Sequence, residues 1–201
     1  MRTTLLSLFG TVGLAGCALL GKNDPVVPRY FTPECDGDTA ATPVRSGLRL
    51  RLGRVEGWSH LRERMVTRDS AREVFFSENR RWTERPEVYL RRALARALFE
   101  ERGVVDALSG RAATLEVELI GFEQIEEPQR ARMRARLVLR VDRTGLLEET
   151  ITVEEPVAKS EGADPARAVV DALSQALCAG VARIADRVVA KLAEQAPDAA
   201  R

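Results

Sequence analysis

The sequence predicts a single α/β domain in which a mixed, mostly antiparallel sheet is covered by two main helices. Two long stretches alternate strictly between apolar and charged residues and are joined by a short loop, which is typical of an antiparallel hairpin. Two other stretches repeat apolar residues at helical spacing. The order of these elements along the chain is strands, helix, three strands, helix. That order fits one layer of helices packed on one sheet.

The predicted hairpin is formed by residues 114–124 and 131–141, with a turn at 126–129. Its first strand alternates leucine and valine with glutamate, and its second alternates apolar residues with arginine. We therefore expect the glutamates and arginines to share one solvent-exposed face, where cross-strand pairs add a few tenths to about 1 kcal/mol each. Residues 146–157 are expected to continue the sheet as a third strand.

Shorter strands are predicted before the first helix. Residues 48–54 alternate leucine with arginine, and Gly53 and Gly57 are expected to end that strand. The segment 65–68 and the apolar run at 74–76 are expected to add two short strands. The residues Arg29-Tyr30-Phe31-Thr32-Pro33 are expected to form a short edge piece within an otherwise extended tether.

Both helices have recognisable ends. The first is expected from Glu84 to Arg102, because Pro86 suits a first helical turn and Gly103 suits a helix end. The second begins at Asp164-Pro165 and continues to about residue 195. The expected core stripes are Leu90, Ala93, Leu94, Ala97 and Leu98 on the first helix, and Val170, Leu173, Leu177, Val181, Ile184 and Val188 on the second. Trp82, at the hinge before the first helix, is expected to anchor the core, with a partner contact as the alternative.

The first helix also carries apolar residues on its opposite side. This stripe is formed by Val88, Ala95 and Phe99, and the flanking arginines are Arg91, Arg92 and Arg96. A helix that is apolar on two sides is either buried in a multilayer core or exposes a contact surface. An apolar centre with an arginine rim is typical of an interface. If it is one, Phe99→Asp should weaken self-association or partner binding; if the stripe is core, the same change should cost several kcal/mol of stability.

The first residues have the pattern of a lipoprotein export signal. One positive charge, Arg2, precedes an apolar run that ends at Leu14-Ala15-Gly16-Cys17, which resembles a bacterial lipobox. The predicted organisation is a signal peptide at 1–16, a lipidated Cys17 with a tether to residue 46, a domain at 47–196 and a disordered tail at 197–201. In enterobacterial lipoproteins an aspartate after the lipidated cysteine favours the inner membrane. Ala18 occupies that position here, so the resemblance implies the outer membrane.

Composition excludes several functions. The 31 basic and 30 acidic residues nearly cancel, which argues against nucleic acid as a partner. The sequence contains one histidine, His60, and no phosphate-binding loop, HExxH or GxSxG motif. We therefore expect no metal, no cofactor and no enzyme activity. No stretch after the first is judged apolar enough to span a membrane.

Two cysteines remain after Cys17. Cys35 and Cys178 are far apart in sequence and show no zinc-binding spacing. In an oxidising compartment we expect them to form a disulfide, and two separate thiols are the alternative.

Four short motifs, in their order behind the lipobox, resemble the ABC-type transport auxiliary lipoprotein family. They are Tyr30-Phe31-Thr32, Leu61 with Met65-Val66-Thr67-Arg68, the Arg81-Trp82-x-x-x-Pro86 hinge, and Leu115-Glu116-Val117-Glu118 with Phe122-Glu123. The resemblance implies a periplasmic, non-catalytic subunit of an ABC transporter that works with mammalian-cell-entry-type proteins on lipids or hydrophobic compounds. It also implies an α/β sandwich that can form rings as a homo-oligomer. The alternatives are an envelope-assembly lipoprotein and a lipoprotein that binds a hydrophobic ligand alone.

Overall fold

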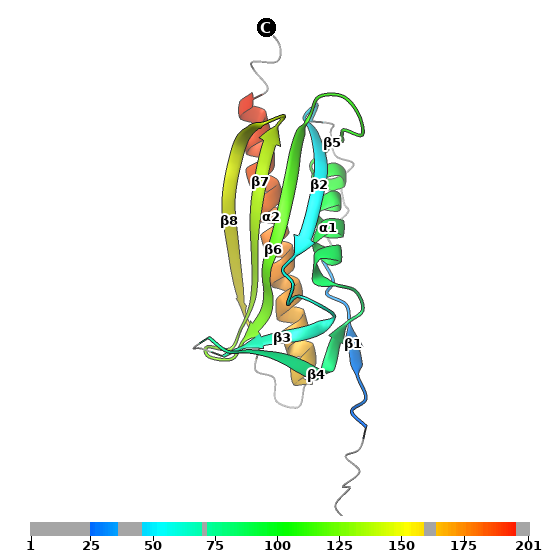
Figure 1. Ribbon diagram of the computed structural model, residues 1–201, viewed down its shortest axis with the longest axis vertical. Helices are drawn as coiled ribbons and strands as arrows, with labels where there is room; N and C mark the ends of the chain where they lie inside the picture. Colours follow the sequence, from blue (N-terminus) through cyan, green and yellow to red (C-terminus); the bar gives the residue numbers. More distant parts are fainter. Residues whose placement is uncertain (1–24, 36–45, 70–71, 159–163, 196–201) are drawn as a thin grey trace, which may run out of the picture.

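The computed structural model describes residues 25–35, 46–69, 72–158 and 164–195. Within these ranges, eight strands form one sheet and two main helices pack against it (Figure 1). The elements in chain order are β1 (Arg29–Phe31), β2 (Arg49–Gly57), β3 (Arg64–Arg68), β4 (Val74–Trp82), α1 (Pro86–Ala95), the π-helical turn η1 (Arg96–Glu101), β5 (Val105–Asp106), β6 (Ala113–Ile125), β7 (Arg130–Val141), β8 (Thr144–Pro156) and α2 (Pro165–Gln195). The predicted α/β fold class is confirmed, and so is the short edge strand at residues 29–31.

Strand β6 organises the sheet. On one side it pairs antiparallel with β7, which in turn pairs antiparallel with β8, and these are the longest ladders in the fold. On its other side β6 has two parallel neighbours in succession. β2 lies beside residues 113–119, and β3 lies beside residues 123–125. β4 pairs antiparallel with β3, and β1 pairs parallel with the end of β4, which completes a mixed sheet.

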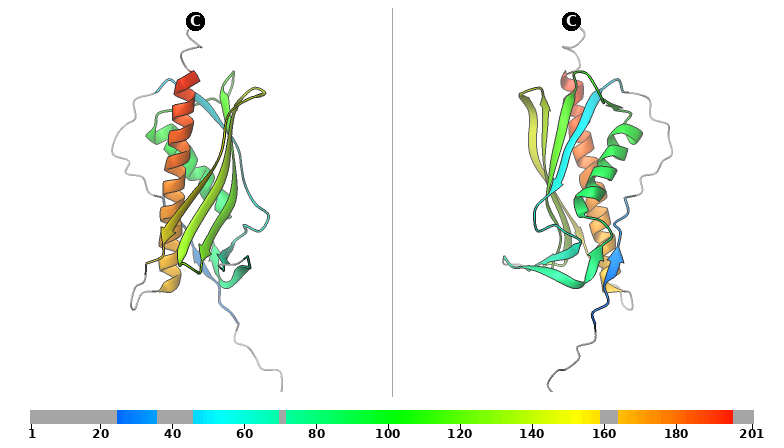
Figure 2. Two further views of the ribbon diagram at one scale, coloured as in Figure 1. Left: turned by 90° about the vertical axis from the view of Figure 1, so that its left-hand side faces the viewer. Right: turned by 45° about the vertical axis from the view of Figure 1, so that its right-hand side comes forward.

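The sheet changes direction where β6 passes from β2 to β3. The pairing of β6 with β7 shifts register between Leu119 and Gly121, at the point where the partner on the other side changes. Such irregularities bend a strand and increase its twist. The β3–β4 hairpin consequently turns away from α2. It extends at the lower end of the molecule, on the side of the sheet opposite the helices (Figure 2).

Helix α2 covers the inner face of β6, β7 and β8 (Figure 2). All six residues of its predicted core stripe are buried, as are the five residues of the stripe predicted on the first helix. Gly180 allows the closest approach of α2 to the sheet, because a Cβ atom at this position would overlap the Sδ atom of Met133. Helix α1 lies beside α2 and packs against β2.

The first helix departs from the expected continuous α-helix over residues 84–102. It begins with Pro86 in its first turn, as predicted, but its regular part ends at Ala95 and η1 continues it to Glu101. A π-helical turn bonds residue i to i+5 and is wider than an α-helical turn. The period of the helix therefore changes at Arg96, although Ala97 and Leu98 in η1 are buried as the 3.6-residue period predicts. Gly103 has a φ of 62°, the left-handed conformation expected after the helix end.

The expectation that no later stretch could span a membrane is wrong on composition alone. Helix α2 is long and apolar enough to qualify, with a mean hydropathy of 1.4 over its most apolar window. Its apolar stripe is buried against the sheet, so in this fold α2 is the core helix.

Candidate anchoring and contact surfaces

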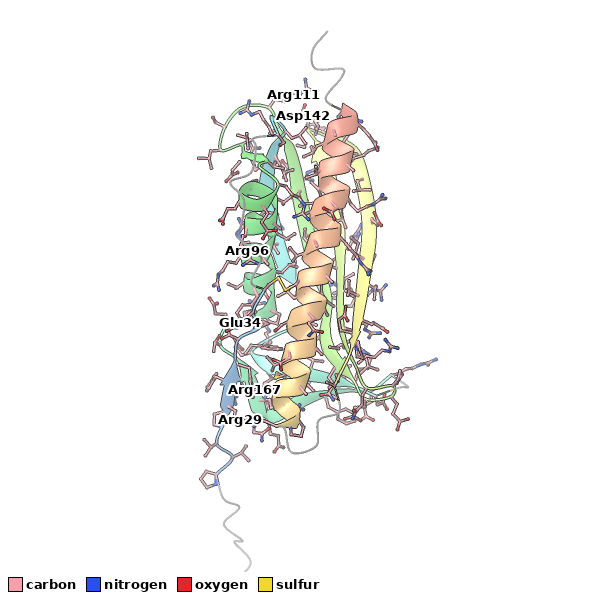
Figure 3. All side chains as sticks on the ribbon, turned by 180° about the vertical axis from the view of Figure 1, so that it is seen from behind. Arg29, Glu34, Arg96, Arg111, Asp142 and Arg167 are labelled. Atoms are coloured by element: carbon pink, nitrogen blue, oxygen red, sulfur yellow. A yellow bond between two sulfur atoms is a disulfide. The ribbon has the colours of Figure 1, made fainter. Side chains whose placement is uncertain are left out.

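Part of the predicted tether is attached to the domain, at three points on or beside α2. We call residues 25–35 the entry segment; it runs alongside the first half of α2 (Figure 3). The guanidinium of Arg29 forms an ion pair with the carboxylate of Asp164, just before the helix. The backbone N–H of Glu34 donates to Ser174 Oγ over 3.2 Å. Cys35 then meets Cys178 in the middle of α2.

The opposite side of the entry segment is attached to the corner between β4 and α1. The N–H of Thr83 donates to the carbonyl of Phe31 over 3.0 Å, next to the β1–β4 ladder. The hydroxyls of Thr32 and Thr83 are 2.8 Å apart, and Thr83 also bonds the buried Tyr89 hydroxyl over 2.7 Å. The entry segment is thus held between α2 and the β4–α1 corner, which fixes the direction in which the chain leaves the domain.

Asp164 has two structural roles: it caps α2 and it holds the entry segment. Its Oδ1 accepts the N–H of Ala166 over 3.0 Å, so it caps α2 while it pairs with Arg29. The hydrogen bond from Arg29 holds the pKa of Asp164 below its usual range and outweighs desolvation, which acts in the opposite direction. The Ala166 N–H and the charge of Arg167 lower the pKa by smaller amounts. The sequence predicted the cap, but it gave no signal for the partner 135 residues away.

The contribution of Asp164 to stability should disappear in acid. Because its pKa is lowered on folding, this contribution is fully present above the unfolded pKa of about 4 and is lost as the pH falls through the lower folded pKa. We expect Asp164→Asn to be less stable than the wild type at pH 7, and the difference to shrink below about pH 4. Urea unfolding of both proteins across this range tests it; a difference that stays constant with pH would contradict it.

The structure places the two cysteines of the expected pair against each other. Their Cα atoms are 5.3 Å apart, within the range that a disulfide spans, and the structure contains the Cys35–Cys178 bond (Figure 3). Sequence spacing had offered a pair and no geometry. The oxidised state in the cell stays a prediction.

Thiol counting tests this disulfide. The denatured, unreduced mature protein should show no free thiol, because Cys35 and Cys178 are bonded and Cys17 carries a thioether. Closing a loop with a sequence separation of 143 should stabilise the fold by up to about 5 kcal/mol on the chain-entropy model, which reduction would remove. As a control, Cys178→Ser should expose one thiol. Two thiols in the wild-type protein would rule the bond out.

The structure separates the residues of the predicted contact stripe on the first helix. Val88 is exposed, whereas Ala95 and Phe99 are half-buried and Phe99 packs against the core. The flanking arginines are engaged within the chain: Arg91 with the carbonyl of Gly53, Arg92 with Glu84, and Arg96 with Glu101. Phe99 lies in η1, beyond the regular part of the helix that carries Val88. The interface at this stripe stays a prediction, and Val88 is its accessible member.

The uncovered face of the sheet carries a ladder of ion pairs, as expected. Arg140 bonds Glu116 over 2.6 Å, and Arg136 bonds Glu148 on the neighbouring strand. A shallow hollow of about 280 Å³ opens between these side chains. These side chains are partly exposed to solvent and their charges balance one another. Each exposed pair contributes little to stability.

Glu123 is the acidic residue whose environment the sequence did not predict. It is 2% exposed and forms ion pairs with Arg68 on β3 and Arg132 on β7. The alternation set by the earlier leucines and valine of β6 would place Glu123 on their inner face. The register shift after Leu119 breaks this alternation, so Phe122 lies in the core and Glu123 pairs with the arginines of β3 and β7. The two arginines compensate the buried charge, which would otherwise be costly. This cluster supports the fold at the base of the sheet.

The structure describes an α/β domain whose entry segment is attached both to α2 and to the β4–α1 corner. Cys17, the predicted lipidation site, and most of the tether lie outside the described residues, as does the tail at 197–201. Across the ranges that the structure describes, no group of three His, Cys, Asp or Glu side chains is placed to hold a metal ion.

Residues 37–185 match the model of the ABC-type transport auxiliary lipoprotein component family. The match covers more than half of the chain, and the chain therefore belongs to this family of envelope lipoproteins associated with ABC transport systems. No curated protein sequence matches the chain.

Solved structures show the same fold. The crystal structure of protein XCC0632 from Xanthomonas campestris superposes with a TM-score of 0.66 at 18% identity, covering 86% of this chain and 100% of that one. The crystal structure of an uncharacterised protein gives a TM-score of 0.63 at 18% identity, covering 81% and 99%. At this identity the likeness concerns the fold alone.

Proposed function

We propose that this chain is a lipid-anchored, non-catalytic auxiliary subunit of an ABC-type transport system that moves lipids or other hydrophobic compounds across the cell envelope. The observation that carries the proposal is the family match across residues 37–185, which follows a lipobox in the same chain. Cys17 would carry the lipid on the periplasmic side, at the outer membrane. The transporter and its mammalian-cell-entry-type proteins would be the partners, with self-association as a further contact.

The surface chemistry supports an interaction subunit over a lipoprotein that binds a ligand alone. Ligand sites are concave and mostly apolar. Two hollows on the described part of the chain are open and contain many charged residues: one lies between β8 and α2 around Arg183, Asp186 and Arg187, and another lies on the ion-pair face. A third, beside the start of α2, is also lined by charged residues, among them Asp164 and Arg167. Such hollows suit contacts with water or with polar protein surfaces better than storage of a hydrophobic molecule.

In-cell cross-linking tests the proposal. The tagged full chain should recover the permease and ATPase of one ABC system together with a mammalian-cell-entry-type protein. Recovery of outer-membrane assembly components in their place would favour an envelope-assembly role. Recovery of none of these proteins would contradict both roles.

A helix substitution locates the contact. We expect Val88→Asp to reduce recovery of the partner at least about tenfold, because a charge buried in an interface costs more than 1.4 kcal/mol. Val88 is exposed, so the domain should melt at an unchanged temperature. Ala190→Asp, at an exposed position of α2, is the matched control and should leave recovery unchanged. If the wild type, Val88→Asp and Ala190→Asp recover the partner equally, the interface lies elsewhere on the domain. Phe99→Asp is less informative, because Phe99 also packs against the core.

A further inference from the structure

Exposed apolar side chains gather at one end of the molecule. Among the described residues, the large hydrophobic side chains that remain exposed are Val26, Val27, Tyr30, Trp58, Phe75, Phe76, Val88 and Leu108. Five of these eight belong to the entry segment or to β4. Strand β4 crosses the lower end of the molecule in Figure 1, and the chain at residue 25 leaves the domain at that same end. Leu108, which is 89% exposed, follows β5 at the opposite end.

Phe75 and Phe76 are not positioned as core residues. Their exposed fractions are 45% and 42%, whereas their partners on β3, Thr67 and Val66, are buried. Successive side chains of a strand point to opposite faces, so both faces of β4 present a phenyl ring to solvent. β1 pairs with residues 80–82, and no other strand among the described residues lies along this edge of β4 beside the two rings. The result is a narrow projection with an aromatic ring on each side.

The length of the tether brings this projection close to the membrane. Seven residues separate Cys17 from Pro25, and the eight steps between these two residues span at most about 26–29 Å when fully extended. This step depends on the lipid anchor at Cys17 in the proposed function. The contacts of the entry segment with α2 and with the β4–α1 corner then hold the β4 end toward the anchor and the Leu108 end away from it.

We propose that Phe75 and Phe76, with Val26, Val27 and Tyr30, form a membrane-contacting surface whose side chains enter the interfacial region of the bilayer that holds the anchor. Aromatic residues suit this region, where apolar and polar surroundings meet. β4 carries Glu78 as well as Arg80 and Arg81, so the surface is not strongly basic. Burial of apolar area therefore drives the contact, and moderate salt does not abolish it.

Quenching by brominated lipids tests this orientation. The full, processed chain is reconstituted into vesicles of phosphatidylethanolamine and phosphatidylglycerol (3:1) with or without bromine on the acyl chains, and only the floated fraction is measured. Emission of the wild-type protein, from Trp58 and Trp82, is subtracted. Phe75→Trp and Phe76→Trp should lose emission in brominated vesicles and shift to shorter wavelength. Leu108→Trp is the matched control at the opposite end and should show neither change.

Three outcomes overturn the inference: no loss for the two β4 variants, equal loss for Leu108→Trp, or burial of the β4 indoles by a second copy of the chain, detected as a dilution-sensitive blue shift without quenching. Mass analysis of the N-terminal peptide tests the anchor separately. A floated protein that lacks the thioether lipid contradicts the proposed anchor, while its quenching still reports on the surface. Failure of the protein to float contradicts both.

Discussion

Replacing Trp82 by alanine is expected to lower the free energy of unfolding by about 3–5 kcal/mol, which is the usual cost of truncating a buried aromatic residue. Trp82 is 1% exposed, and its ring centroid lies 5.2 Å from that of Phe122 and 6.4 Å from that of Tyr89. These contacts join the end of β4 to α1 and to β6. Trp82→Ala therefore leaves a cavity where three elements meet.

Urea unfolding measures this loss, and Trp58→Ala provides the control. Trp58 is 46% exposed and makes an edge contact with His60, so its truncation should cost less than about 1 kcal/mol. A domain of this size has a total stability of about 5–15 kcal/mol, so the difference between the two variants should be plain. Similar losses for both variants would mean that Trp82 is not the anchor of this corner.

Replacing Cys17 by serine is expected to abolish lipid attachment completely. A thioether lipid requires the thiol, and serine has the same size without that chemistry. Metabolic labelling with an alkyne-bearing fatty acid should mark the wild-type protein and not Cys17→Ser, and fractionation should find the variant unanchored or unprocessed. Cys178→Ser is the control that removes a different thiol and should retain the label. Unchanged labelling of Cys17→Ser would exclude the anchor at this residue.

The sequence was sufficient for elements whose stability is local. Helix α2 begins at Pro165 after the Asp164 cap and ends at Gln195, close to the predicted limits, because cap, proline and apolar stripe all act within a few residues. The β6–β7 hairpin was equally evident, because alternation and a short turn specify pairing between neighbours in sequence.

Elements that depend on distant partners were not predictable in this way. Residues 77–82 are mostly polar, and they form a strand through partners outside the segment. β1, some fifty residues earlier, pairs with their end, and Arg64 of β3 pairs with Arg81. β2 likewise continues past Gly53 to Gly57, since parallel pairing with β6 supports it. The parallel placement of both β2 and β3 beside one strand follows from the bend at residues 119–121, for which local propensity gives no signal.

The candidate surfaces also differ in whether local sequence pattern could predict them. The ion-pair face followed from alternation within two adjacent strands, and the structure confirms it. The exposure of Phe75 and Phe76 could not be predicted from the sequence, because an apolar pair in a short strand is usually buried. The sequence does not show that these rings lie at an edge of the sheet, at the end of the domain where residue 25 lies. The structure shows both features.

The strap at the entry segment determines how the domain carries mechanical load. With the Cys35–Cys178 bond formed, tension on the lipid anchor proposed at Cys17 passes through residues 25–35 and reaches the middle of α2 by a covalent route. The short β1–β4 ladder is then not the last restraint, because a pull that opens its three residue pairs is stopped at Cys35. Beyond that point the force acts along the axis of the 31-residue helix, in shear against the whole inner face of the sheet. In the proposed function, where a lipid at Cys17 anchors the chain, the domain can therefore be pulled from the anchor side without its strands separating one by one.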